Sequence, residues 1–211
     1  VGSGKSSVAR WAACELPDAS SVDRRDAACD LRILSGDEAG HSVLKIPSVL
    51  EAVRHVFGDS VFDSHGQIVR QALADRVFGP EPDQVAARRR LEEIVHPRIR
   101  DQLEKEIQEA CRHPETRAVI LDAAVLFEAG WNAICEAVVF IDTPLEVRQQ
   151  RVRESRGWSD DELRRREQSQ WPLERKRAAS DYVLDNSGTA EETARQLRHW
   201  IEQLIAGKSN H

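Results

Sequence analysis

The first residues with recognisable chemistry are Gly4, Lys5 and Ser6, which stand in the order found at the end of a phosphate-binding loop. In such a loop, backbone N–H groups surround phosphate oxygens, the lysine contacts the β- and γ-phosphates, and the serine hydroxyl ligates Mg²⁺. The full pattern, G-x-x-x-x-G-K-[ST], would place its first glycine before Val1. The three residues alone also fit an ordinary helix N-terminus, so they indicate a nucleotide site only if other segments agree.

Two aspartates follow short apolar runs that are typical of strands. Asp37 comes after residues 31–34, and Asp122 comes directly after residues 119–121. In enzymes with a phosphate-binding loop, carboxylates at such positions hold Mg²⁺ or accept the proton of the attacking hydroxyl group. Aspartate also favours helix caps, which is the simpler interpretation of a single case. Because two of them follow strands in one chain, the functional interpretation is favoured here.

Basic residues are concentrated in residues 148–177, which contain ten of the thirty lysines and arginines: Arg148, Arg151, Arg153, Arg156, Arg164, Arg165, Arg166, Arg175, Lys176 and Arg177. Acidic residues alternate with most of them, as on an exposed helix surface. Residues 157–159 divide the run into two helices with a hinge, which is the form of a mobile lid. We expect Arg148, Arg151 or Arg156 to close over the phosphates of a nucleotide.

The overall composition limits the possible partners. The 211 residues carry a net charge of −6, which disfavours nucleic acid and acidic membrane surfaces. No apolar run approaches the roughly 18–20 residues of a membrane span, and no signal segment is recognisable. The cysteines have no C-x-x-C spacing, so we expect buried free thiols in a reducing cytoplasm. These cysteines are Cys14, Cys29, Cys111 and Cys135.

The elements that must position these residues can be read from the apolar pattern. Continuous apolar runs predict strands that are buried on both faces, and each run leads into a helix. The predicted strands are 31–34, 118–121, 137–141 and 182–184, and the predicted helices include 6–15, 47–57 and 190–205. Alternating buried strands and helices predict an α/β fold with a doubly wound parallel sheet, whose ligands bind at the carboxyl ends of the strands.

A long helical stretch interrupts this alternation. Residues 69–112 have an almost wholly helical pattern, and we expect breaks at 79–80 and at 96–97, where prolines stand. We interpret residues 45–112 as an inserted domain. His96 would then lie between two amphipathic helices, where a capping role is the simpler interpretation. The other histidines show no spacing typical of metal ligands.

Five segments together resemble the dephospho-CoA kinase family, whose members transfer the γ-phosphate of ATP to the ribose 3′-hydroxyl group of dephospho-CoA. The family patterns are G-G-x-G-S-G-K-S-T, R-x-A-L-x-x-x-V-F, x-x-H-P-x-I, D-x-P-L-L-F-E and A-D-x-V-I-D-N-x-G. The similar segments here are residues 2–7, 70–78, 94–99, 121–128 and 180–188. The third and the fifth of these are specific in this order and spacing, whereas the phosphate-binding loop alone is not.

The resemblance implies a P-loop nucleoside-kinase fold with three layers. It implies a nucleotide-binding core (1–44, 113–147 and 181–211), a helical insertion that holds the coenzyme A moiety (45–112) and a helical lid (148–180). The implied ATP site consists of Gly2, Ser3, Gly4, Lys5, Ser6, Ser7, Asp185 and Asn186, with the last two near the adenine. The implied substrate site consists of Ser35, Asp37, His96, Asp122, Leu126, Phe127 and Glu128. Ser6 and Asp122 would hold Mg²⁺, and Lys5, Asp37 and the three arginines named above would act in catalysis.

The chain departs from the family pattern at three places. The family begins with a central strand and two glycines that are missing before Val1, so we expect a gap in the sheet. Ser35 stands where the family has its presumed general base, an aspartate, and Asp37 could assume part of that role. A register that used Asp23 instead would require a long insertion. Ala124 replaces a proline, which we expect to matter little.

We therefore interpret the chain as an ATP-dependent dephospho-CoA kinase of the cytoplasm, with Mg²⁺ as cofactor and dephospho-CoA as its small-molecule substrate. We expect a monomer without nucleic-acid or membrane partners. The alternative hypothesis is a degenerate relative that binds coenzyme A or nucleotide without phosphoryl transfer. A kinase of the same fold for another small hydroxyl substrate is disfavoured by the specific segments at 94–99 and 180–188.

Overall fold

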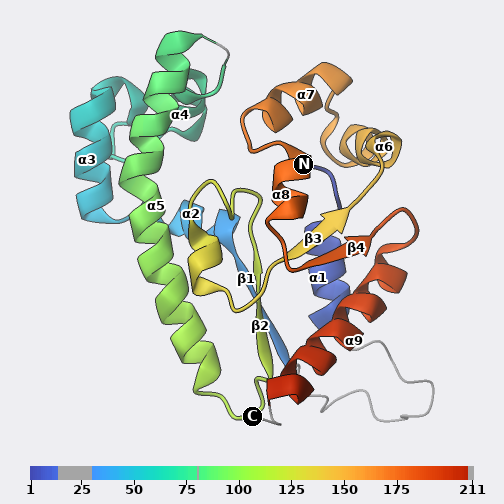
Figure 1. Ribbon diagram of the computed structural model, residues 1–211. Helices are drawn as coiled ribbons and strands as arrows, with labels where there is room; N and C mark the ends of the chain where they lie inside the picture. The colour runs from blue at the N-terminus through green and yellow to red at the C-terminus, as the bar shows by residue number, and fades with distance from the viewer. Residues whose placement is uncertain (14–29, 80, 209–211) are drawn as a thin grey trace. The chain divides into compact units, whose positions relative to one another are not determined.

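The computed structural model describes residues 1–13, 30–79 and 81–208 (Figure 1). Cys14, Cys29, Asp23 and the end of the helix predicted at 6–15 lie outside these residues. The chain forms two compact units, which we describe separately. The first unit contains Val1–Leu34 and Ile107–His211, and the second contains Ser35–Glu106. The predicted insertion, 45–112, and the second unit share residues 45–106.

The strands of the first unit form two pairs. β1 (Leu31–Ser35) is hydrogen-bonded to β2 (Ala118–Asp122), and β3 (Val139–Asp142) is hydrogen-bonded to β4 (Tyr182–Asp185). β3 and β4 run parallel, with Val139 opposite Tyr182 and Asp142 opposite Asp185. All four predicted strands are therefore confirmed, with small shifts at their ends. The class is α/β with parallel strands, as predicted.

In the described residues the strands form two pairs with a gap between them, because no hydrogen bonds join β2 to β3. A cavity of about 770 Å³ is lined by both of these strands and by α1 (Lys5–Ala13) and α9 (Ala190–Lys208). β2 and β3, which would have to pair to complete one sheet, thus line this cavity instead of contacting each other. A gap at this place in the sheet was expected from the family resemblance.

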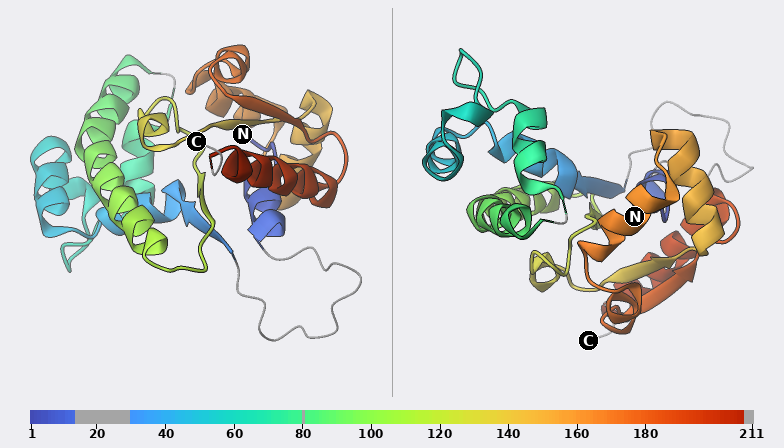
Figure 2. Two further views of the ribbon diagram at one scale, coloured as in Figure 1. Left: turned by 60° about the horizontal axis from the view of Figure 1, so that its bottom comes forward. Right: turned by 90° about the horizontal axis from the view of Figure 1, so that it is seen from above.

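Helices α1 and α9 pack against each other and cover the first unit's core (Figures 1 and 2). Their apolar faces meet side chains of the strands, because Val8 and Leu197 share one buried cluster with Ile141 and Leu184. The helical spacing of such residues is what predicted both helices. The start of α1 at Lys5 is thereby fixed next to the carboxyl ends of the strands.

The basic segment folds as α6 (Leu145–Arg156), α7 (Asp160–Gln168) and α8 (Leu173–Ala178). The predicted break at 157–159 is confirmed, since Gly157 ends α6 in a left-handed conformation and the hydroxyl group of Ser159 caps α7. The short helix α8 was not predicted. Trp158 joins the two longer helices, because the guanidinium groups of Arg156 and Arg166 lie 4.7 and 4.3 Å from its ring centre.

The second unit is mainly helical in its described residues, apart from the end of β1 at Ser35 and an isolated antiparallel β-bridge between Phe62 and Ile68. Its elements are α2 (Gly36–Val43), α3 (Pro47–Phe57), a 3₁₀ turn η1 (Asp59–Val61), α4 (Arg70–Val77) and the first part of α5 (Pro82–Cys111). Its core consists of buried side chains of α3, η1 and α4, namely Val49, Val53, Val61, Leu73 and Val77. Partly buried residues of α5 pack against this core, which anchors the first half of that long helix.

Helix α5 continues through Pro97, so the predicted break at 96–97 is wrong. Proline removes one backbone donor and crowds the carbonyl group four residues earlier, at Glu93. Apolar contacts hold the helix on both sides of this position. Leu91, Ile94 and Val95 pack on the core of the second unit, and Ile99 and Leu103 are buried farther along. Packing therefore outweighs the local cost of the proline.

Two expectations from composition can be compared with the structure. Cys111 is exposed and Cys135 is half-buried, so the expected burial of the thiols is wrong for Cys111. Cys111 is the last residue of α5, and exposure is common at a helix end. Of the helices in the described residues, none combines the length and the apolar character that spanning a membrane requires.

Replacing Pro97 by alanine restores an N–H donor in the interior of α5 and removes the crowded ring. We expect Pro97→Ala to raise the free energy of unfolding by about 1–3 kcal/mol, since proline costs about 3 kcal/mol inside a helix. Urea unfolding measures the change. The neighbouring exposed variant Arg98→Ala is the control and should alter stability by less than about 0.5 kcal/mol. A loss of stability in Pro97→Ala would contradict this account.

Candidate functional site

The predicted phosphate-binding loop, residues 2–7, requires glycine at two positions. Gly2 and Gly4 have φ angles of +72° and +79°, in the left-handed region that favours glycine. A Cβ atom on Gly2 would lie 2.8 Å from Cγ1 of Val152, and one on Gly4 would lie 2.9 Å from Nδ2 of Asn186. The loop thus lies directly against α6 and the end of β4. Helix α1 then begins at Lys5, with its N-terminal N–H groups facing the loop.

Ser6 and Asp122 are brought together from residues that are far apart in the sequence. The hydroxyl group of Ser6 donates a hydrogen bond to the carboxylate of Asp122, at the carboxyl end of β2. Asp122 is therefore not a helix cap, and its contact favours the functional interpretation. Within the described residues, no three His, Cys, Asp or Glu side chains gather as a metal site. A hydroxyl and a carboxylate oxygen fit a hard cation that keeps waters and phosphate oxygens as its other ligands.

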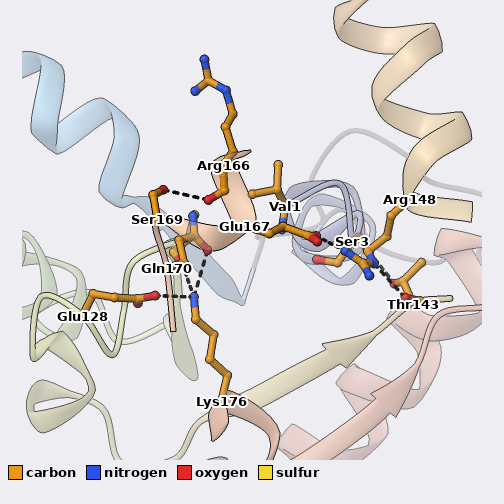
Figure 3. Close-up of polar contacts among 11 residues, drawn as sticks. Val1, Ser3, Glu128, Thr143, Arg148, Arg166, Glu167, Ser169, Gln170 and Lys176 are labelled. Carbon is orange, nitrogen blue, oxygen red and sulfur yellow. Dashed lines mark hydrogen bonds and ion pairs between the residues drawn. The ribbon is translucent and has the colours of Figure 1, made fainter. Parts of the chain in front are cut away.

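The three predicted lid arginines contact protein groups in this structure. Arg148 is buried, donates to the carbonyl group of Thr143 at 3.1 Å and pairs with Glu167 of α7 (Figure 3). Burial lowers the pKa of its guanidinium group. Arg151 donates to the carbonyl groups of Ser3 at 3.3 Å and Gly188 at 3.4 Å. The guanidinium group of Arg156 stacks on Trp158, as described above.

A buried lysine connects α8 to the segment that follows β2. The ammonium group of Lys176 contacts Oε1 of Glu128 at 2.8 Å, the carbonyl group of Ala124 at 2.9 Å and Oε1 of Gln170 at 3.0 Å (Figure 3). The carboxylate of Glu128 also accepts from the backbone N–H of Trp171 at 2.7 Å. We call these residues the Lys176 cluster. The three protons of the ammonium group match the three acceptors, which compensates its burial.

The Lys176 cluster was missed by sequence reasoning. Lys176 belongs to the basic run that alternates with acidic residues, and such a pattern is typical of an exposed surface. Its partners are 6, 48 and 52 residues away by numbering, so no helical or strand period could reveal them. The stacking of Phe127 on Trp171, with ring centres 5.6 Å apart, supports the same connection.

The remaining predicted site residues of the first unit either line a cavity or have their own local contacts. Leu126 and Phe127 line a small cavity of about 80 Å³ together with Lys5. The exposed carboxylate of Asp185 accepts from the N–H of Ser187 at 2.9 Å, whereas the side chain of Asn186 is fully buried. Lys5 also lines the larger cavity. Ser7 is half-buried in the first turn of α1.

Three predicted site residues belong to the second unit. Ser35 caps α2, because its hydroxyl group accepts from the backbone N–H of Glu38 at 3.2 Å. Asp37 is exposed in the first turn of α2, and His96 is half-buried on α5. The N-cap of α2 is therefore Ser35 and not Asp37.

Comparison with known proteins gives one consistent result. The family model described as dephospho-CoA kinase matches residues 1–192. A dephospho-CoA kinase of Rhodopirellula baltica is 36% identical over 83% of this chain and 80% of its own length. That of Corynebacterium diphtheriae is 35% identical over 94% and 90%. A crystal structure of a Thermus thermophilus protein has a TM-score of 0.70 at 30% identity, covering 97% of this chain and 93% of that one.

The Lys176 cluster makes a prediction about stability. Lys176→Met leaves the carboxylate of Glu128 buried without its cation, so we expect a loss of about 3–5 kcal/mol in the free energy of unfolding. Adding Glu128→Gln should recover part of this loss, with a coupling of about 1–3 kcal/mol between the two sites in urea unfolding.

The control for this cycle is the pair of Glu191 and Arg195 on α9. Its atoms are also 2.8 Å apart, but its side chains are 43% and 57% exposed, compared with 16% and 10% for Glu128 and Lys176. The coupling measured for Arg195→Met and Glu191→Gln should be at most about 0.5 kcal/mol. Equal couplings in the two cycles would show that burial does not strengthen the Lys176 pair.

Proposed function

The chain belongs to the dephospho-CoA kinase family, and on this premise we propose which of its residues carry the reaction. The protein is a kinase that transfers the γ-phosphate of ATP to the ribose 3′-hydroxyl group of dephospho-CoA, the last step of coenzyme A biosynthesis. Relatives at 30–36% identity have the same name, so the alternative of a relative that binds without phosphoryl transfer is not favoured.

The contact between Ser6 and Asp122 is the observation that carries our assignment of the phosphate site. Lys5 directly precedes Ser6 and would hold the β- and γ-phosphates, with the backbone N–H groups of residues 2–7 around them. Ser6 and Asp122 would hold Mg²⁺, which when bound neutralises charge on the β- and γ-phosphates. Their oxygen atoms suit this ion, and phosphates and waters would complete its coordination.

The attacking 3′-hydroxyl group of dephospho-CoA must lose a proton. Ser35, at the position of the family's presumed base, is a poor acceptor at pH 7, and its oxygen already accepts from the N–H of Glu38. We propose that Asp37, whose carboxylate is exposed in the first turn of α2, accepts this proton or organises the metal site. Because phosphoryl transfer depends mostly on positioning and charge neutralisation, a displaced base can still support turnover.

The remaining assignments follow the family and the local contacts. Residues 148–180 would form a lid over the nucleotide, within a three-layer fold of the P-loop nucleoside-kinase type. Residues 45–112 with His96, together with Leu126, Phe127 and Glu128, would bind the coenzyme A moiety. Arg151 already has its guanidinium group at the loop, because it donates a hydrogen bond to the carbonyl group of Ser3. Arg148 and Arg156 would have to exchange their protein partners to reach a phosphate.

We further propose that the enzyme acts in the cytoplasm as a monomer. ATP and dephospho-CoA are both small molecules, so the reaction itself requires no macromolecular partner. The negative net charge of −6 does not suit nucleic acid as a partner. Light scattering of the purified protein tests the oligomeric state, and a dimer at micromolar concentration would overturn that part of the proposal.

Lys5→Ala should abolish turnover, because the variant lacks the cation that contacts the transferred phosphoryl group. We expect kcat to fall by at least about 10³-fold in a coupled assay of ADP release with dephospho-CoA. Arg10→Ala, which removes an exposed cation from the last turn of α1 outside the assigned site residues, is the matched control and should retain normal activity. Normal turnover in Lys5→Ala would exclude the assigned phosphate site.

Asp37→Asn tests the proposed proton acceptor. If Asp37 is the base, kcat should fall by about 10²–10⁴-fold, with a smaller change in the KM for ATP. Glu38→Gln alters the adjacent exposed carboxylate and should have little effect. Ser35→Asp restores the family's residue and can still cap α2, so it should raise kcat. If Asp37→Asn and Glu38→Gln behave alike, another group takes the proton.

A further inference from the structure

The carbonyl oxygen of Ser3 is held by three donors from three different elements. It accepts from Nδ2 of Asn186 at 2.6 Å, from the hydroxyl group of Thr143 at 3.0 Å and from Nη1 of Arg151 at 3.3 Å. Thr143 directly follows β3, Asn186 directly follows β4, and Arg151 lies on α6. Figure 3 shows Ser3 beside Thr143 and Arg148. A carbonyl oxygen in this loop is thus turned toward the protein.

The direction of this carbonyl group determines the direction of the next N–H group. In a planar trans peptide, the C=O and N–H bonds point to opposite sides. Because the oxygen of Ser3 points at Asn186, the N–H of Gly4 points away from Asn186. Backbone N–H groups directed outward in this way form the concave anion sites of phosphate-binding loops. The same contacts turn the carbonyl oxygen of Ser3, with its partial negative charge, away from the place where a phosphate would bind.

The side chain of Asn186 is hydrogen-bonded to the loop and to buried protein groups instead of solvent. Its side chain is fully buried, and both ends of its amide group are engaged. Nδ2 donates to Ser3, and Oδ1 accepts from the hydroxyl group of Thr193 at 2.9 Å, a residue that is only 1% exposed. The carbonyl group of Ser3 can only accept, so the amide has one possible orientation. The hydroxyl group of Thr193 lies 2.9 Å from Oδ1 of Asn186, nearer than the carbonyl groups of Asp185 at 3.1 Å and Thr189 at 3.3 Å. A proton donated to this nearest acceptor supports the same orientation, in which Asn186 donates to Ser3.

The backbone also holds Asn186 in place. Its N–H donates to the carbonyl group of Asp142 at 2.7 Å and so extends the pairing of β4 with β3 by one residue. The side chain consequently starts from a rigid strand end. Gly4 completes the fit, because a Cβ atom there would lie 2.9 Å from Nδ2 of Asn186. A larger residue at either position would push the loop away from the strand.

We propose that Asn186 and Thr193 are positioning residues that shape the phosphate cradle of the nucleotide site, and that the side chain of Asn186 does not contact the adenine. This inference rests on the proposed function, since it assumes that residues 2–7 bind the phosphates of ATP. It differs from the expectation that Asn186 belongs to the adenine site. It predicts that the two side chains affect the binding of any polyphosphate and leave the choice of base unchanged.

Thr193→Val tests this proposal, because valine has a similar shape and lacks the hydroxyl donor. In isothermal titration of the full chain, we expect ADP and inorganic tripolyphosphate to bind about five- to tenfold more weakly, by the same factor, as one buried hydrogen bond is lost. The KM for dephospho-CoA and the ratio of kcat/KM for ATP over GTP should not change. Asn186→Ala should show the same pattern with a larger loss, and Thr193→Val remains informative if that variant does not fold.

Thr189→Val is the matched control. Thr189 caps the start of α9, where its hydroxyl group contacts Glu192 at 2.9 Å and is not bonded to Asn186. This variant also loses a hydroxyl group from the same region and should be less stable. It should nevertheless bind ADP and tripolyphosphate like the unmodified protein, which separates loop positioning from general destabilisation.

The following results would overturn the proposal or separate it from the proposed function. A changed ratio of ATP to GTP use, or a loss confined to ADP with tripolyphosphate unaffected, would assign Asn186 to the base. Unchanged affinities in Thr193→Val with lowered stability would mean that the hydroxyl group is merely structural. If the unmodified protein binds ADP but does not phosphorylate dephospho-CoA, the proposed function fails while the positioning role can still hold. If it binds neither ADP nor tripolyphosphate, both proposals fail.

Discussion

The nucleotide site that we propose depends on how its loop, residues 2–7, is hydrogen-bonded to the strand ends beside it. Gly2 and Gly4 allow the left-handed backbone that the loop needs, but glycine by itself makes a chain more flexible. Rigidity comes instead from the hydrogen bonds to the carbonyl group of Ser3, whose donors stand on three separate elements. The loop can therefore keep its N–H groups in place before any anion arrives. Such preorganisation is what makes backbone dipoles effective in phosphoryl transfer.

The basic segment after β3 has a structural role besides any role over the nucleotide. Arg148 and Lys176 are buried and bonded to carboxylate and carbonyl groups, so their charges are compensated within the protein. A phosphate that recruits Arg148 must replace acceptors that the guanidinium group already has. Arg151 differs, because its contacts are two neutral carbonyl groups at 3.3 and 3.4 Å and leave much of its charge available. The structure thus distinguishes cations that the sequence presents as equivalent.

The fold could be predicted well where a pattern is local and poorly where distant contacts decide. The strands, the helix from Pro47 to Phe57 and the helix break at 157–159 followed from apolar runs and from glycine and proline signals. The continuation of α5 through Pro97 did not, because packing on both sides outweighs the local preference. The exposure of Cys111 likewise depends on what lies beside this residue in space, which composition does not contain.

The sequence by itself determined the family and the class of reaction, because short motifs in a given order are specific to the family. It also predicted the phosphate-binding loop and brought Ser6 and Asp122 into one predicted site. Only the tertiary structure decided that Asn186 turns inward to the loop and that Lys176 pairs with Glu128. The physical reason is that burial and hydrogen bonding are properties of neighbours in space. Residues that are 183 positions apart, as Ser3 and Asn186 are, become neighbours only when the chain folds.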